Sequence, residues 1–138
     1  MGIRYAVGVG TILLCDYDTG FRSPEMVKRR PAVVISPRLP HRDQLCTVVP
    51  LSTTPPAIEV PYVCKIDLPS PLPSPFNSTT VWVKADMLAT VAFWRLDLFR
   101  TKRDASGKRQ YLKPVLAAED LRRVQICVLH ALGMSGLT

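Results

Sequence analysis

Residues 28–37 read Lys28-Arg29-Arg30-Pro31-Ala32-Val33-Val34-Ile35-Ser36-Pro37, which joins three cations directly to a short β-branched segment capped by proline. The Val and Ile residues predict a strand, and Pro31 fixes its own φ while it favours extended backbone at Arg30. The guanidinium of Arg30 is therefore held at the mouth of the strand, where a planar and permanently charged group suits a phosphate or a carboxylate. A plain solubilising role for the three cations is the alternative interpretation.

The charge of the whole chain favours an anionic partner. Its 138 residues are enough for one domain with its own core, and 18 Lys and Arg against 11 Asp and Glu give a net charge of +7. Nucleic acid is the first candidate partner and a membrane surface the second. No run approaches the roughly eighteen apolar residues of a membrane span, and the start of the chain lacks a signal-like apolar segment. We therefore expect a cytoplasmic protein that does not enter a membrane.

The cysteines and histidines offer no metal site. Cysteines occur singly, without spacing such as C-x-x-C, and we expect reduced core residues at Cys15, Cys46, Cys64 and Cys127. The two histidines, His41 and His130, have no neighbouring ligand or nucleophile pattern. The sequence therefore predicts neither a metal nor a cofactor.

Short β-rich segments dominate the chain. They are rich in Val, Ile, Thr, Tyr and Cys and are separated by Pro, Gly, Asp and Ser. We predict strands over residues 11–17, 32–36, 46–51, 62–66 and 80–84, with a further strand over 87–93. This pattern is typical of a small β-barrel or sandwich.

The C-terminal segment predicts a helix over about residues 117–132. Apolar residues recur there at helical spacing, whereas the arginines at 122 and 123 face the other way. Two acids in the first turn match the helix dipole, and Gly133 follows as a stop. The domain is therefore mainly β with one C-terminal helix.

Two connecting segments stand out. Prolines at every second position from 69 to 75 cannot donate hydrogen bonds to a sheet, so we predict an exposed polyproline-like loop over residues 67–78. Residues 99–112 predict a hairpin, because Asp104-Ala105-Ser106-Gly107 supplies turn residues between two polar arms. The tip of this hairpin is basic.

Four motifs in this order resemble the PemK/MazF family of toxin endoribonucleases. They are Gly10-Thr11-Ile12-Leu13, the block from Glu25 to Ser36, Thr47-Val48-Val49-Pro50-Leu51-Ser52-Thr53-Thr54, and the closing helix with Glu119-Asp120-Leu121 and Val124. The resemblance extends from about Gly10 to Leu132. It implies an SH3-like β-barrel with a C-terminal helix over a single domain, residues 1–138, and a homodimer. It also implies metal-independent, sequence-selective cleavage of single-stranded RNA, and inhibition by a cognate antitoxin, in which we expect an acidic, disordered segment.

The resemblance also assigns site residues. The expected catalytic residues are Arg30, Ser52, Lys84 and Asp86. Glu25 matches the acidic residue of the same loop as Arg30, and Thr53 stands beside Ser52. Met87 and Ala89 replace the Gln and Arg of the family pattern.

The same chemistry follows from residue types. Cleavage of RNA by its own 2′-hydroxyl needs a base for that proton, an acid for the departing 5′-oxygen, and cations for the crowded phosphorane. Lys84 and Asp86 stand two apart in a predicted strand, so their side chains would leave the same face and flank one phosphate. Arg30 would clamp that phosphate.

Further cations are candidates for RNA binding. They are Lys28 and Arg29 beside Arg30, and the hairpin residues Arg100, Lys102, Arg103, Lys108 and Arg109. Trp82 and Trp94 lie in apolar runs, which favours packing over base stacking.

Each assignment has a structural alternative. Lys84 and Asp86 also fit a solvated strand pair, Ser52 and Thr53 fit hydrogen bonds to their own backbone, and Glu25 fits a loop cap. The functional alternative is a binding module that docks on a protein, as gyrase-poisoning toxins of similar fold do, or that binds nucleic acid without cutting it. A regulatory protein that has lost catalysis is a third interpretation.

Overall fold

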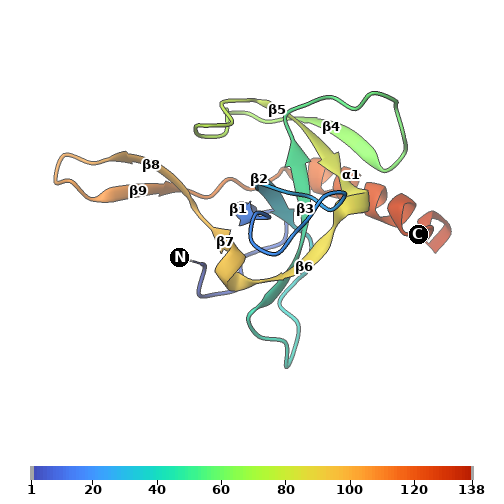
Figure 1. Ribbon diagram of the computed structural model, residues 1–138, viewed down its shortest axis with the longest axis horizontal. Coiled ribbons are helices and arrows are strands. Elements are labelled where there is room, and N and C mark those ends of the chain that lie inside the picture. The colour runs from blue at the N-terminus through green and yellow to red at the C-terminus, as the bar shows by residue number, and fades with distance from the viewer. Residues whose placement is uncertain (1, 138) are drawn as a thin grey trace.

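A bent antiparallel sheet and one long helix form most of the structure, a computed structural model that describes residues 2–137 (Figure 1). The strands are β1 (Ile12–Asp16), β2 (Arg29–Val34), β3 (Leu45–Ser52), β4 (Val63–Asp67), β5 (Thr80–Lys84), β6 (Ala89–Ala92), β7 (Leu96–Asp97), β8 (Phe99–Arg103) and β9 (Arg109–Leu112). Short 3₁₀ turns η1 (Ala85–Met87), η2 (Phe93–Arg95) and η3 (Ser135–Leu137) and the helix α1 (Ala118–Ala131) complete it. Hydrogen bonds order the main sheet as β4-β5-β3-β2-β1-β7, and β6 pairs with β3. The predicted mainly β fold with a C-terminal helix is confirmed.

One edge of β3 is shared by two strands. Its first half pairs with β6 as far as Val48 opposite Ala89, and its last two residues pair with β5 from Leu51 opposite Val83. Between these two pairs, β3 advances by three residues, whereas the segment that runs from β5 to β6 advances by six. The turn η1 accommodates the three additional residues. The predicted strand over residues 87–93 is therefore shorter, because part of the chain turns away as η1 before pairing resumes.

Two prolines lie inside strands, which corrects the prediction that Pro31 precedes its strand. Val34 of β2 exchanges hydrogen bonds with Gly10 and Thr11, whereas Ile35 donates to Thr47 on the β3 side. By this alternation Pro31 faces the β3 side, where the ladder has already ended at Ala32 opposite Pro50. Pro50 faces the other edge of β3, between the last β6 pair and the first β5 pair. Neither missing N–H therefore removes a ladder hydrogen bond.

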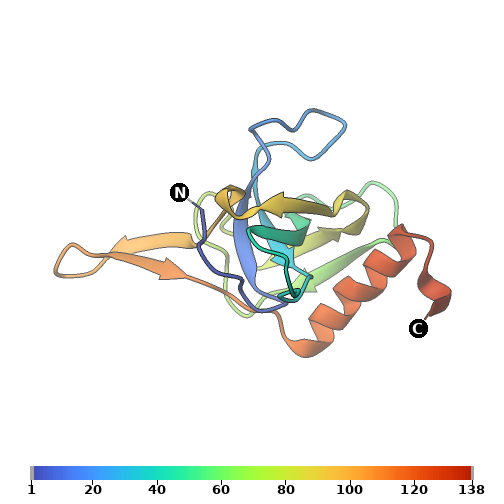
Figure 2. The same cartoon turned by 90° about the horizontal axis from the view of Figure 1, so that it is seen from below.

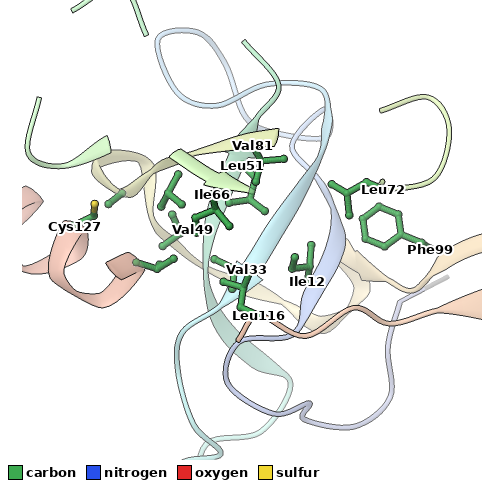
Figure 3. Close-up of a cluster of buried hydrophobic side chains, with 13 residues drawn as sticks. Ile12, Val33, Val49, Leu51, Ile66, Leu72, Val81, Phe99, Leu116 and Cys127 are labelled. Carbon is green, nitrogen blue, oxygen red and sulfur yellow. The ribbon is translucent and has the colours of Figure 1, made fainter. Parts of the chain in front are cut away.

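The strands β1, β2 and β3 are buried on both faces. Alternate residues contribute to two clusters, so that Val33 and Val49 lie in one and Val34 and Val48 in the other. Figure 3 shows the first cluster, which also receives Leu116 and Cys127 from the C-terminal part of the chain. Burial on both faces explains why these strands read as nearly continuous apolar runs.

The helix α1 packs its apolar face on the first cluster. Val124 and Cys127 are buried, and Leu121 and Val128 are partly buried. After the helix, Gly133 adopts a φ of 70° and the N–H of Met134 donates to the carbonyl of Leu129 at 2.7 Å. This is the expected glycine stop. No helix among residues 2–137 has both the length and the apolar character needed to cross a bilayer.

The proline-rich segment 67–78 has exposed prolines at 69, 71 and 75, and it is also anchored to the core. Leu72 is only 2% exposed, and the ring of Phe76 meets that of Phe99 edge to face at 6.3 Å between centroids. Residues 73–76 form a turn, with the N–H of Phe76 donating to Pro73 at 3.1 Å. Leu72 and Phe76 therefore attach the segment to the core, and the spacing of the prolines did not indicate this role.

The β8–β9 hairpin is confirmed, and it projects from the body of the molecule. It pairs as a separate two-stranded sheet from Phe99 opposite Leu112 to Arg103 opposite Arg109. Both views show its tip far from α1 (Figure 2). Asp104 organises the turn, because its carboxylate accepts the N–H groups of Ser106 and Lys108 at 2.9 Å each.

Candidate functional site

A cleft of about 450 Å³ opens where β3 ends. Its walls are Ser52, the loop that follows β3, and the end of β5 with η1, which bring Lys84 and Asp86 to the same space. Three of the four expected catalytic residues therefore line one cleft. The loop between β3 and β4 and the first residue of β4 add lining residues that the sequence analysis did not identify, namely Thr54, Pro55, Pro56, Ala57, Ile58, Val60, Tyr62 and Val63. The only sequence signal for them was the run of Thr and Pro after a predicted strand.

Arg30 is close to this cleft by register but does not line it. Ala32 lies opposite Pro50, so the same antiparallel register would place Arg30 level with Ser52. The guanidinium is half-buried, and its Nε donates to the carbonyl of Val27 at 2.9 Å. One hydrogen bond therefore fixes the side chain, and its terminal nitrogens make no hydrogen bond within residues 2–137.

Asp86 and Lys84 meet in the cleft by a different geometry from the one predicted. Lys84 is the last residue of β5, but Asp86 lies in the 3₁₀ turn η1 and not on the same strand face. The strand ends there because the N–H of Leu88 donates to Ala85 at 3.3 Å, which closes the turn. Asp86 is exposed and Lys84 half-buried, and no ion pair joins the two within the described chain. The two side chains are thus separate groups on one wall.

Ser52 bonds to its own backbone neighbourhood. The Oγ accepts the N–H of Thr54 at 3.0 Å and donates to the carbonyl of Thr54 at 3.2 Å, and the residue is only 5% exposed. This geometry matches the structural alternative given for Ser52. It fixes the start of the loop that forms one wall of the cleft. Thr53 is exposed beside it.

Three more of the predicted RNA-binding residues, Glu25, Lys28 and Arg29, lie in the loop between β1 and β2 and at the start of β2. The carboxylate of Glu25 accepts the N–H of Arg22 at 2.9 Å, so Glu25 caps its own loop. Lys28 is exposed with a φ of 74°, and Arg29 begins β2 opposite Asp16. Neither Glu25, Lys28 nor Arg29 lines the cleft.

Arg95 anchors this loop, a role that no sequence pattern indicated. Its Nη1 donates to the carbonyls of Asp16 at 3.1 Å and Thr19 at 2.6 Å. The guanidinium contacts two aromatic rings, at 4.7 Å from the centroid of Phe21 and 4.4 Å from that of Trp94. Trp94 is 56% exposed, so the prediction that it packs inside the barrel is wrong. Trp82 is half-buried in β5.

The hairpin cations lie apart from the cleft. In both ribbon views the β8–β9 hairpin extends to one side, and the loop after β3 lies on the other side, towards α1 (Figures 1 and 2). Three of the arginines have partners within or next to the hairpin: Arg100 pairs with Asp97 at 3.7 Å, Arg103 donates to Gly107 at 2.9 Å, and Arg109 donates to Thr101 at 3.1 Å. Lys102 and Lys108 are exposed.

All four cysteines are free. Burial raises the pKa of the Cys15 thiol to about 12, so Cys15 behaves as a core residue. Cys64 of β4 and Cys127 of α1 share a hydrogen bond, which lowers the pKa of Cys64 and raises that of Cys127. No three His, Cys, Asp or Glu side chains among residues 2–137 are grouped as metal ligands are.

Comparison with known proteins identifies the family. The fold is similar to that of an endoribonuclease solved in complex with its cognate antitoxin from a mycobacterial species, with a TM-score of 0.62 and 21% identity over 94% of this chain and 97% of that one. It is also similar to MazF from Deinococcus radiodurans, with a TM-score of 0.58 and 24% identity over 94% and 99% of the two chains. The toxin MazF-mt6 of Mycobacterium tuberculosis gives a TM-score of 0.56 and 16% identity over 89% and 96%. No curated protein matches the sequence.

At these identities the solved structures establish the fold, and the sequence match establishes membership. The family model of PemK-like, MazF-like toxins matches residues 9–126, most of the chain. The chain therefore belongs to the PemK-like, MazF-like toxins of type II toxin-antitoxin systems.

Proposed function

We propose that this chain is the toxin of a type II toxin-antitoxin system and acts as a sequence-selective endoribonuclease on single-stranded RNA, without a metal. The observation that carries the proposal is the convergence of Ser52, Lys84 and Asp86 on one cleft, from β3, β5 and η1. Family membership and the fold shared with an endoribonuclease support it.

The proposed reaction uses the RNA's own 2′-hydroxyl as nucleophile. Asp86 accepts the 2′-hydroxyl proton while the 2′-oxygen bonds to the adjacent phosphorus. The bond from phosphorus to the 5′-oxygen breaks, and Lys84 donates a proton to that oxygen. The products are a 2′,3′-cyclic phosphate and a 5′-hydroxyl, so the step needs no water and no cofactor.

Arg30 and Ser52 have supporting roles in this proposal. Arg30 approaches the phosphate from the neighbouring strand and stabilises the charge that gathers on the phosphorane, since its terminal nitrogens make no hydrogen bond to the described part of the chain. Ser52 fixes the wall of the cleft through its two contacts with Thr54. We assign Glu25, Lys28, Arg29 and Thr53 to RNA binding around the cleft, with the β8–β9 hairpin as an outer cationic arm.

We further propose that the toxin acts as a homodimer in the cytoplasm. A cognate antitoxin would inhibit it with an acidic, disordered segment that covers the cationic surface used by RNA. One of the similar structures, the mycobacterial endoribonuclease, was solved with its cognate antitoxin, which supports this partner. Competition between the antitoxin segment and a non-cleavable RNA tests it, because independent binding would place the inhibitor elsewhere.

The function is tested by incubating the purified protein with single-stranded RNA in excess EDTA. Fragments that end in a 2′,3′-cyclic phosphate are the expected products, and sequencing their 5′ ends would give the cleavage motif. Intact RNA that stays bound would show a binding module in place of an enzyme. Cleavage only after a divalent metal is restored would contradict the metal-independent mechanism.

A further inference from the structure

A second and larger groove lies at the opposite end of β3 from the cleft. Its volume is about 690 Å³, and it lies between the N-terminal segment 4–7 and the loop that joins β2 to β3. The lining residues place these two segments on either side of the groove, at the end of β3 that begins with Leu45. None of the residues assigned above to RNA lines this groove.

The groove is cationic. Arg4, Arg38 and Arg42 line it, against a single carboxylate from Asp43. Asp43 accepts the N–H of Gln44 at 2.9 Å, so part of its charge is directed at the backbone. Within residues 2–137, the guanidinium groups of Arg38 and Arg42 have neither a hydrogen bond nor an ion pair. They differ in this respect from the hairpin residues Arg100, Arg103 and Arg109, each of which has a local partner.

An aromatic side chain stands on the wall of the groove. Tyr5 is 79% exposed, so its ring is open to contact with a ligand in the groove. A positively charged groove with an exposed ring is the arrangement by which proteins hold single-stranded nucleic acid, since phosphates meet the cations and bases stack on the ring.

The cleft alone does not explain affinity for a polyanion. Of its charged lining residues, Lys84 and Asp86 carry opposite signs and balance each other. The segment 84–93 connects the two sites, because Lys84 and Asp86 line the cleft and Phe93 lines the groove. It runs beside β3, whose ends Leu45 and Ser52 line the two sites and lie about 23 Å apart at the usual rise of a strand.

From these observations we propose that the groove is a second RNA subsite, which holds the substrate strand several nucleotides from the bond that is cut. Arg38 and Arg42 bind phosphates, and Tyr5 stacks on a base. The inference rests on the proposed function in naming RNA as the ligand, but it concerns binding and not chemistry. It predicts that long substrates bind more tightly than the cleft alone allows.

The experiment measures binding of 2′-O-methyl RNA, which lacks the nucleophile and stays intact. A mixed-sequence 12-mer reaches both sites, whereas a trinucleotide derived from it fills only one. The double variant R38Q/R42Q should lose about tenfold or more in affinity for the 12-mer, and the slope of its salt dependence should fall by about 1.4. Y5A should weaken 12-mer binding at least about fivefold with the salt slope unchanged, since it removes stacking and no charge. Trinucleotide binding in the cleft should not change in either variant.

A matched control removes two charges elsewhere. K113Q/R122Q lowers the net charge equally at exposed positions outside the groove, cleft and hairpin, and should keep wild-type affinity and slope. Thermal unfolding midpoints equal to wild type would establish that each variant is folded. Wild-type 12-mer affinity in R38Q/R42Q, or an equal loss in the control, would overturn the subsite.

Two further outcomes separate this inference from its neighbours. If wild-type protein binds the 12-mer through the groove but leaves unmodified RNA intact, the proposed cleavage fails and the subsite stands. If R38Q/R42Q loses affinity for a glutamate-rich peptide while RNA binding is unchanged, the groove is a protein-docking site and the RNA assignment is wrong.

Discussion

Among single residues, Arg30 and Arg29 provide the sharpest contrast. They are neighbours in β2 with the same charge, but Arg30 is half-buried and held by Val27, whereas Arg29 is exposed. Arg30→Ala should therefore lose about 2–4 kcal/mol of transition-state stabilisation, the scale for removing one preorganised donor. Arg29→Ala should cost much less. Single-turnover cleavage rates of the two folded variants decide the matter, and equal losses would contradict the role of Arg30.

The two charged groups of the cleft have separable roles. Asp86→Asn should slow cleavage about a hundredfold or more, the usual scale for loss of a general base, while RNA affinity stays the same or rises because a negative charge is removed. Lys84→Met should lower both rate and affinity. Rates at saturating RNA, together with binding of a non-cleavable analogue, distinguish the two effects. A native rate in Asp86→Asn would require another base, with Glu25 the next candidate.

At the scale of elements, the proline-rich segment behaves as part of the core. Leu72→Ala should destabilise the protein by about 2–5 kcal/mol, because it leaves a cavity beside Phe76 and Phe99. Ser70→Ala, an exposed change in the same segment, should lie within about 0.5 kcal/mol of wild type. Denaturant unfolding measures both. A small effect in Leu72→Ala would show that the segment is only loosely attached.

The β1–β2 loop depends on Arg95. Arg95→Ala removes two hydrogen bonds and two aromatic contacts, so backbone amides between residues 18 and 28 should exchange with solvent about tenfold faster. Cleavage should slow as well, since this loop leads into Arg30. Hydrogen exchange followed residue by residue separates a local effect from general destabilisation. Arg122→Ala, an exposed change on α1, is the control and should leave the loop unchanged.

The limits of sequence-based prediction also become clear at this scale. Short segments rich in Val, Ile, Thr, Tyr and Cys located the strands β1, β3, β4 and β5 to within about two residues, because burial dictates their composition. The errors fell where tertiary register decides the local structure. The prediction starts β2 after Pro31, because a proline cannot donate a hydrogen bond to a neighbouring strand. In the structure Pro31 lies inside β2, since the hydrogen bonds to β3 end at Ala32 and none is needed at Pro31. The prediction puts Asp86 on a strand, because no residue near it indicates that the chain forms the turn η1 there.

The candidate site was predictable only in part, for the same reason. Family motifs identified Ser52, Lys84 and Asp86, which the fold brings to one cleft. Their relative geometry, the walls formed by the loop after β3, and the anchoring by Arg95 depend on contacts between distant segments. The burial of Leu72 and Phe76 could not be predicted either, since the prolines around them indicate an exposed loop.

For the whole molecule, the question is how the net charge of +7 is used. The hairpin should contribute affinity and not chemistry, because it projects away from the cleft (Figures 1 and 2). The triple variant K102Q/R103Q/K108Q should lower the salt slope of RNA binding by up to about 2, at about 0.7 for each lost phosphate contact. Its single-turnover rate at saturating RNA should stay close to wild type. An unchanged slope would assign the hairpin to another partner.

The projection of this hairpin has a consequence for solubility. Its two strands pair only with each other in the described chain, so each has an outer edge of unpaired backbone groups. Such edges invite strand addition by a second molecule, and charged side chains are the usual protection against it. Lys102, Arg103 and Lys108 therefore discourage edge-to-edge aggregation whatever ligand they meet. We therefore expect a variant with a neutralised hairpin to self-associate at lower concentrations than the wild-type chain.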